Sequence, residues 1–216
     1  MTSGDEDWIV PELGSILVVK LGGSLLLWEG MPDRLRRFLE WAGDQGAKVI
    51  VITGGSDPAN FIRELDKCHQ MPNRSSHDMA VRAMDLTSHC LAALMGPDLE
   101  VVDHFSAMKS VWETGRTPVL APFRFLTEVD ALQANALPAN WRVTSDSIAA
   151  RVAEVVKATD LVLLKSRDVP PGTSIREAVR LGLVDPMMPE MATKIPRVIT
   201  VNFRKQSSMA QELINL

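Results

Sequence analysis

Three short stretches of the sequence carry residue types that bind and transfer phosphate. The first, residues 20–24, places two glycines and a serine just after Lys20, and the second is the Gly-Gly-Ser run of residues 54–56. The third, residues 144–147, brings Asp146 to the start of a helical pattern. Glycines let main-chain N–H groups approach an anion closely, and lysine supplies positive charge. These residue types predict phosphoryl transfer, which needs positioning and charge stabilisation more than covalent help from the protein.

Both glycine pairs follow apolar runs that are typical of buried parallel strands. Residues 16–21 and 47–53 are such runs, and helical patterns follow them over residues 32–46 and 59–68. A single Gly-Gly pair after a strand usually marks only a turn, but here the strand, Gly-Gly and helix plan occurs twice. Ligands of open parallel sheets bind outside the carboxyl ends of the strands, so we expect both turns to face one cleft.

Serine and threonine stand where these helices begin, and they have a structural role available whether or not phosphate binds. Ser56 is suited to be the N-cap of its helix, and Thr144 or Ser145 is suited to cap the helix that follows them. Asp146 is favourable in the first turn of that helix, because the helix dipole stabilises a negative charge there.

Helical and strand patterns alternate along the rest of the chain. They predict further helices over residues 75–96, 106–115, 148–156, 174–181 and 207–214, and further strands over residues 99–102, 118–122, 160–165 and 197–203. This alternation predicts an α/β fold, a three-layer αβα sandwich with a mostly parallel central sheet. We expect residues 1–14 to be a polar tail and residues 15–216 to be a single domain.

The longest helical pattern, residues 75–96, has an apolar stripe that we expect to face the core. Five side chains recur at helical spacing and form this stripe: Met79, Ala83, Leu86, Cys90 and Leu94. Four others fall off the stripe and are expected on a solvated face, or as an alternative along a ligand or partner surface: His77, Met84, Asp85 and Ser88.

Composition and charge argue against several classes of function. The 216-residue chain is 46% hydrophobic and has a formal net charge of −4 without a basic stripe, so no nucleic-acid partner is expected. No apolar run is long enough to span a bilayer and the N-terminus is acidic, so we expect no membrane partner and a cytoplasmic location. Cys68 and Cys90 lack CxxC spacing, and His77 lacks a second ligand, which predicts neither a disulfide nor a metal site held by the protein.

The glycine turns do not belong to the commonest nucleotide-binding motifs. The chain has no P-loop pattern, and neither glycine pair extends to Gly-x-Gly-x-x-Gly. It instead resembles the amino acid kinase superfamily in three ordered signatures: Val-Lys-Leu-Gly-Gly-Ser at 19–24, Ile-Thr-Gly-Gly-Ser at 52–56 and Thr-Ser-Asp-Ser-Ile-Ala at 144–149. Residues 76–85 and 141–147 are similar to one branch, the aminomethylfuran-methanol phosphate kinases of methanofuran biosynthesis.

The resemblance implies an activity and a set of site residues. It implies that ATP converts a small phosphomonoester to a diphosphate, with Mg²⁺ held mainly by the nucleotide phosphates. The implied catalytic residues are Lys20, Asp146 and Lys165, with Lys20 steadying the transferred group and Asp146 orienting the lysine. The implied phosphate-binding residues are Gly22, Gly23, Ser24, Gly54, Gly55 and Ser56, and the implied substrate contacts are Arg63, His77, Asp85, Thr144 and Ser145. It also implies a homodimer or a higher homo-oligomer.

Three departures from the family pattern keep a second function open. Ser56 takes the place of a third glycine, and residues 165–172 replace the Asp-Gly turn common at the nucleotide site. Glu190 stands where a second catalytic lysine often follows a proline, and Lys194 is four residues on. The alternative is a catalytically degenerate kinase fold that binds a nucleotide or a protein partner. A kinase for a carboxylate substrate is a third option, although the sequence shows no clear carboxylate clamp.

Overall fold

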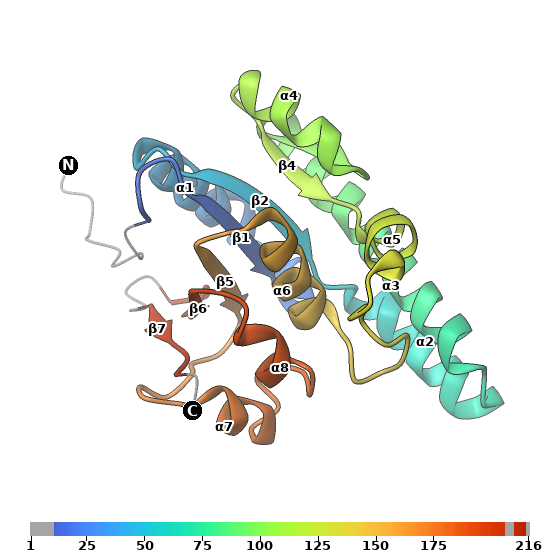
Figure 1. The fold of residues 1–216 in the computed structure, drawn as a ribbon. Coiled ribbons are helices and arrows are strands. Elements are labelled where there is room, and N and C mark those ends of the chain that lie inside the picture. Colours follow the sequence, from blue (N-terminus) through green and yellow to red (C-terminus); the bar gives the residue numbers. More distant parts are fainter. Residues whose placement is uncertain (1–10, 206–209, 215–216) are drawn as a thin grey trace.

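The computed structural model describes residues 11–205 and 210–214, and within them seven strands form one sheet (Figure 1). Its strand order is β3-β4-β2-β1-β5-β6-β7, and every neighbouring pair is parallel except β6 and β7. The strands are β1 (Ile16–Leu21), β2 (Lys48–Thr53), β3 (Leu99–Val102), β4 (Thr117–Leu120), β5 (Asp160–Lys165), β6 (Arg197–Asn202) and β7 (Gln211–Glu212). The predicted α/β class and mostly parallel sheet are confirmed. The predicted polar tail falls mainly on residues 1–10, which lie outside the described residues.

Helices cover both faces of the sheet and make the predicted three layers. They are α1 (Met31–Asp44), α2 (Ser56–His69), α3 (Asn73–Met95), α4 (Met108–Glu113), α5 (Pro122–Arg124), α6 (Ser145–Val156), α7 (Ile175–Arg180) and α8 (Met188–Ala192). One apolar core cluster joins α6 to Val18 and Leu161, and the other joins α1 to Val19 and Val162. Figure 1 shows the sheet between α1 and α6, while α2 lies beside α3, which also contacts β2, β3 and β4. None of the described helices combines the length and apolar character needed to cross a bilayer.

The two-residue period of the strands decides where the candidate lysines point. Side chains alternate between the faces of a sheet, so Lys20 shares a face with Val18, and Lys165 shares a face with Leu161. Lys20 and Lys165 therefore lie on the same face of the sheet, the face that α6 covers. Lys20 is paired in register with Leu163 of β5 and with Ile52 of β2. The carboxyl ends of these three central strands therefore lie side by side.

The apolar stripe predicted for the long helix α3 is correct for Ala83, which is buried, and wrong for its last three members. Leu86 and Leu94 are 52% and 54% exposed, and Cys90 is also exposed. Three polar or flexible side chains predicted on the solvated face are buried instead: His77, Met84 and Ser88.

The buried side of α3 carries four apolar side chains at helical spacing, Val81, Met84, Leu91 and Met95, together with hydroxyls that are hydrogen-bonded. Thr53 Oγ1 lies 2.8 Å from Thr87 Oγ1, and Ser88 Oγ donates to the carbonyl oxygen of Met84 at 2.9 Å. Hydroxyls whose hydrogen bonds are made inside the protein can be buried at little cost. The sequence thus offers two apolar stripes on α3, and the buried one is the stripe whose hydroxyls find partners at the end of β2.

The end of the chain also differs from the sequence prediction. Residues 211–214 were expected in a helix, but Gln211 and Glu212 form β7, which pairs antiparallel with Thr200 and Ile199 of β6. Leu213 is buried next to this strand. The short helix α8 was not predicted, because five residues are too few for a helical period to show in the sequence.

Candidate functional site

Two lysines from neighbouring strands meet one aspartate at the carboxyl end of the sheet. Lys20 Nζ lies 3.0 Å from Asp146 Oδ1, and Lys165 Nζ lies 2.8 Å from each carboxylate oxygen of the same residue. Asp146 stands in the first turn of α6, where the helix dipole favours a carboxylate. The structure thus brings together all three residues predicted to be catalytic.

Burial and mutual attraction perturb the charges of this cluster. Burial alone would raise the pKa of Asp146, but the positive charges of Lys20 and Lys165 outweigh it and lower that pKa to about 2. Burial lowers the pKa of Lys165 to about 8, with Lys20 acting in the same direction and Asp146 against it. Asp146 is therefore a permanent anion near neutral pH, whereas Lys165 titrates just above it.

The two glycine bends pack directly against each other. A Cβ atom on Gly23 would stand 2.7 Å from the main-chain nitrogen of Ser56, and one on Gly54 would stand 2.8 Å from the nitrogen of Gly23. Real Cβ atoms do not approach main-chain atoms this closely, so both positions need glycine. Residues of both bends also line one pocket, which confirms the expectation that both turns face one cleft.

Not every predicted amide donor is available to a phosphate. The amide of Gly22 donates to Leu164 O at 3.0 Å, and the amide of Gly54 donates to Leu21 O at 2.9 Å, so these two predictions are wrong. Both bonds continue the parallel strand ladder past the ends of β1 and β2. Four neighbouring amides donate to no acceptor within residues 11–205 and 210–214: those of Gly23, Ser24, Gly55 and Ser56.

Ser56 departs from its expected role as an N-cap. Gly55 is the N-cap of α2, and Ser56 begins the helix with a φ of 51°. This left-handed conformation is unfavourable for a residue with a Cβ atom. Ser56 Oγ donates to the carbonyl oxygen of Gly23 at 3.0 Å, which ties the two bends together. The serine in the third glycine place therefore keeps the glycine-like backbone and adds a hydrogen bond across the site.

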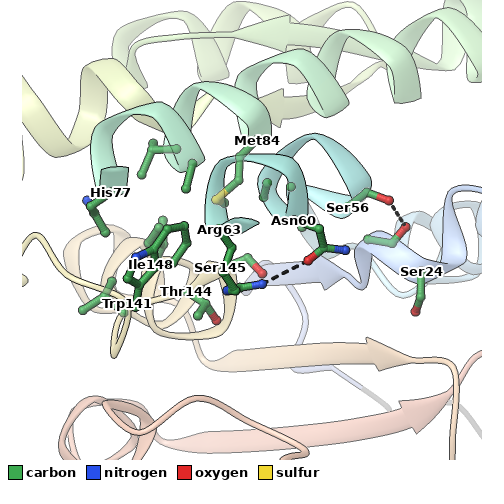
Figure 2. A pocket seen from close by; sticks show the side chains of 17 residues that line it. Ser24, Ser56, Asn60, Arg63, His77, Met84, Trp141, Thr144, Ser145 and Ile148 are labelled. Carbon is green, nitrogen blue, oxygen red and sulfur yellow. Dashed lines mark hydrogen bonds between the residues drawn. The ribbon is translucent and has the colours of Figure 1, made fainter. Parts of the chain in front are cut away.

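A pocket of about 280 Å³ opens beside the glycine bends (Figure 2). Its lining comes from both glycine bends, α2, α3 and the start of α6, together with the loop before α6. It contains nine of the residues predicted to bind phosphate or substrate: Gly23, Ser24, Gly54, Gly55, Ser56, Arg63, His77, Thr144 and Ser145.

Trp141 is fastened to α2 and forms part of the pocket wall. The guanidinium carbon of Arg63 lies 4.7 Å from the centre of the indole ring, and Trp141 Nε1 donates to the carboxylate of Asp66. Arg63 Nη1 also donates to Asn60 Oδ1 at 3.0 Å. The loop before α6 is thereby held against α2, with a cation and an aromatic face lining the pocket.

Asp85 is the one predicted substrate contact that the structure places elsewhere. Its carboxylate accepts a hydrogen bond from the amide of Phe123 at 3.1 Å, and it does not line the pocket described here. Burial raises the pKa of Asp85. Asp85 faces away from the pocket because α3 presents His77 and Met84 to it. Its role in the structure is to hold α5 against α3.

Residues 15–170 match the sequence profile of the amino acid kinase family. The chain belongs to the amino acid kinase family. A curated relative, the [5-(aminomethyl)furan-3-yl]methyl phosphate kinase of Methanocaldococcus jannaschii, is 26% identical over 151 residues. That alignment covers 70% of this chain and 66% of the relative, so the chain spans just under two thirds of the relative's length.

Two solved structures of kinases have the same fold. Uridylate kinase from Archaeoglobus fulgidus superposes with a TM-score of 0.61 at 16% identity, covering 92% of this chain and 99% of that one. Aspartate kinase from Synechocystis superposes with a TM-score of 0.63 at 14% identity, covering 94% of this chain and 40% of that one. At such identities the likeness establishes the fold alone.

Asp185 is a residue of this amino acid kinase site that sequence reasoning missed. Thr144 or Ser145 was expected to cap α6, and Thr144 does stand at the N-cap position, but the acceptor is the carboxylate of Asp185 from a loop about forty residues downstream. It accepts from the amide of Thr144 at 2.9 Å and from the amide of Ser147 at 3.0 Å, and both hydroxyls donate to it as well. Burial raises the pKa of Asp185, and the negative charge of Asp146 adds to the effect. No local motif could have revealed it, because its partners are distant in sequence.

The structure shows which contacts are made by the lysines and by the turn that depart from the family pattern. Lys165 occupies the cluster around Asp146, whereas Lys194 pairs with Glu154 at 3.4 Å. In the turn after β5, Asp168 pairs with Lys205 at 2.5 Å. Ser24 Oγ donates to Ser166 Oγ at 3.1 Å, so this turn also touches the first glycine bend.

Proposed function

We propose that this amino acid kinase uses ATP to phosphorylate a small phosphomonoester, giving a diphosphate. The observation that carries the proposal is the Lys20, Asp146 and Lys165 cluster next to two packed glycine bends. Two buried ammonium groups and four open amides make a region of positive potential, which suits phosphate groups at both the donor and the acceptor side.

The reaction requires no covalent bond between the protein and the substrate. An oxygen of the substrate phosphate attacks the γ-phosphorus of ATP, a new P–O bond forms, and the bond to the leaving ADP breaks in line with it. The attacking oxygen of a phosphate dianion has no proton to lose. Lys20 and Lys165 stabilise the negative charge on the transferred group, and Asp146 holds their ammonium groups in place.

Magnesium fits this scheme as a companion of the nucleotide. No group of three or more His, Cys, Asp and Glu side chains capable of holding a metal occurs in the part of the chain that the structure describes. Mg²⁺ commonly keeps several waters and binds through substrate phosphates, and it would supply further neutralisation of phosphate charge. The open amides of the glycine bends and the two lysines are the protein groups that would face those phosphates.

The relative's name suggests the substrate. We propose [5-(aminomethyl)furan-3-yl]methyl phosphate or a similar precursor of a one-carbon cofactor, since the curated relative carries that activity in its name. The pocket supports a molecule of this kind because it is small and has an aromatic wall and open amides at one end.

A direct assay tests the proposal. The purified protein is mixed with ATP, Mg²⁺ and [5-(aminomethyl)furan-3-yl]methyl phosphate, ADP release is followed by a coupled assay, and the product is examined by ³¹P NMR. We expect ADP and a diphosphate in equal amounts. The proposal is refuted if the protein shows no turnover and calorimetry detects no binding of the phosphomonoester.

A degenerate kinase fold is the second candidate, because of the altered turn after β5. Asp168 and Lys205 pair there at 2.5 Å, and Asn202 Nδ2 donates to Asp168 at 3.0 Å, in the region where the family binds its nucleotide. Calorimetric titration with ATP separates the two candidates. Tight ATP binding without turnover on any phosphomonoester would favour the degenerate fold.

We also propose that the protein forms a homodimer through α3. Leu86, Cys90 and Leu94 are spaced by four residues and lie exposed on one side of this helix. A contiguous apolar stripe on a long helix is typical of a surface that packs against another chain.

A further inference from the structure

His77 is a buried imidazole in the pocket wall without a hydrogen-bond partner among the described residues. Its exposed fraction is 6%, and neither Nδ1 nor Nε2 has a partner within residues 11–205 and 210–214. Buried side-chain polar groups are normally paired, so an unpaired one in a pocket marks a group that a ligand can pair.

The surroundings of His77 determine which ring nitrogen accepts. Nδ1 lies 3.9 Å from Asp78 Oδ1, and the negative charge there favours a hydrogen atom on Nδ1. Burial lowers the pKa of His77, with Arg74 acting in the same direction, so the imidazole is neutral near pH 7. Nε2 therefore carries a lone pair and accepts a hydrogen bond.

The pocket has two chemically different ends (Figure 2). Ser24 and Ser56 lie at the end formed by the glycine bends, and His77 lies at the opposite end near Trp141. Between them the lining combines four apolar side chains with the polar Asn60 and Arg63; the apolar ones are Val81, Met84, Val143 and Ile148. A ligand whose phosphate occupies the glycine end therefore directs its other end toward His77.

We infer that Nε2 of His77 accepts a hydrogen bond from a donor group at the end of the substrate remote from its phosphate. The pocket then selects phosphomonoesters of compact, apolar alcohols that end in an amine or a hydroxyl group. This inference rests on the proposed function, because it requires the phosphate to lie at the glycine end. A protonated amine makes the stronger, charge-assisted hydrogen bond, and a methyl group in its place leaves Nε2 unpaired.

Three esters that differ only in their far end test the assignment: [5-(aminomethyl)furan-3-yl]methyl phosphate and its hydroxymethyl and methyl analogues. Calorimetry without ATP gives each Kd, and turnover with ATP and Mg²⁺ gives each kcat/KM. We expect the wild type to bind the amine about 10- to 100-fold more tightly than the methyl analogue, with the hydroxyl analogue between them. His77→Leu should reduce this preference to less than about threefold, mainly by weakening amine binding.

Two further variants separate recognition from folding. His77→Leu removes an unpaired buried polar group at similar volume, so its Tm should equal or exceed that of the wild type. His77→Gln offers an amide oxygen as acceptor and should retain part of the preference. His69→Ala is the matched control, because His69 is exposed at the end of α2, and it should leave all three Kd values unchanged.

The outcomes distinguish this inference from the proposed function. If the wild type binds all three esters equally, or if His77→Leu weakens them by the same factor, the role of His77 is overturned while the kinase proposal stands. If His77→Leu is unstable, His77→Gln is used in its place. A stable His77→Gln protein that no longer prefers the amine over the methyl analogue overturns the role of His77. If the wild type binds none of the esters, the proposed function fails and the inference fails with it.

Discussion

Lys165 and Asp146 meet where the last residue of β5 touches the first turn of α6, with Lys165 Nζ 2.8 Å from both carboxylate oxygens. This contact joins a strand end to a helix end across one layer of the sandwich. It also places a lysine whose pKa is about 8 beside the end of Lys20, so the site's positive charge depends on pH just above neutrality.

The pH dependence of turnover should report the titration of Lys165. Its ammonium group loses a proton as the pH rises through about 8, and the site then has one charge fewer to stabilise the transferred phosphoryl group. We expect kcat/KM for ATP to fall above that pH. Lys165→Arg should keep its charge and shift the fall to higher pH, whereas Lys165→Met should lower kcat about 100-fold or more near pH 7. A wild-type profile that stays flat up to about pH 10 would contradict the assignment.

Asp146 should make a pH-dependent contribution to stability. Its pKa is about 2 in the folded protein against an ordinary value of 3.8, so its stabilisation is complete above about pH 4 and is lost as the pH falls through 2. The lowered pKa corresponds to about 2 kcal/mol. Asp146→Asn should cost about 3–5 kcal/mol near pH 7, because two buried lysines lose their shared carboxylate.

Urea unfolding over a series of pH values measures this contribution. The difference in unfolding free energy between the wild type and Asp146→Asn should shrink as the pH falls from about 5 to about 2. Asp33→Asn is a suitable control, since Asp33 is an exposed aspartate in the first turn of α1. A difference that is constant with pH would show that the two lysines do not stabilise the carboxylate.

Local patterns predicted the parts of the site that are contiguous in sequence. Each glycine bend and the Thr-Ser-Asp start of α6 is a continuous run of a few residues, so its residue types indicate phosphate chemistry without any knowledge of its neighbours in the fold. Strand periodicity also predicts that Lys20 points to the same face as Val18. The placement of Lys20 and Asp146 at one site follows from these local features together with the parallel sheet.

Features that depend on distant partners could not be predicted. Asp185 caps α6 from another loop, and the orientation of α3 depends on hydroxyl contacts with Thr53 in β2. The sequence of α3 carries a second apolar stripe with Val81, Leu91 and Met95, and this stripe is buried together with the satisfied hydroxyls of its face. The loss of the Gly22 and Gly54 amides to the strand ladder was likewise invisible, because it depends on strand register.

Asp185 should act as a positioning residue for the start of α6. Its carboxylate raises the pKa of Lys165 through charge, so Asp185→Asn should move the basic fall in kcat/KM to a pH below that of the wild type. It should lower kcat more than it raises KM, because substrate contacts remain while the helix start loosens. Asp185→Ala should in addition cost about 2–4 kcal/mol, since the amides and hydroxyls of Thr144 and Ser147 lose their acceptor. A merely structural role would lower the Tm without shifting the pH profile.

A charged side chain introduced into the exposed stripe on α3 should prevent the proposed homodimer from forming. Leu86→Arg should convert a dimer to a monomer in light scattering at micromolar concentration, because a buried unpaired arginine at an interface is costly. Leu132→Arg is the control, since Leu132 is 80% exposed and lies outside α3. A wild-type protein that is monomeric at every concentration would refute the proposed dimer.

Gly23→Ala should disable the phosphate cradle while leaving the fold in place. The added Cβ would stand 2.7 Å from the main-chain nitrogen of Ser56, and this contact can be relieved only by moving one bend away from the other. We expect the KM values of both substrates to rise about 10-fold or more, because the open amides no longer converge. Gly43→Ala is the matched control, since it lies inside α1 with nothing within 4 Å of the added Cβ, and it should leave turnover unchanged and stability equal or slightly higher. Equal effects of the two substitutions on KM would mean that contact between the bends is not needed for binding.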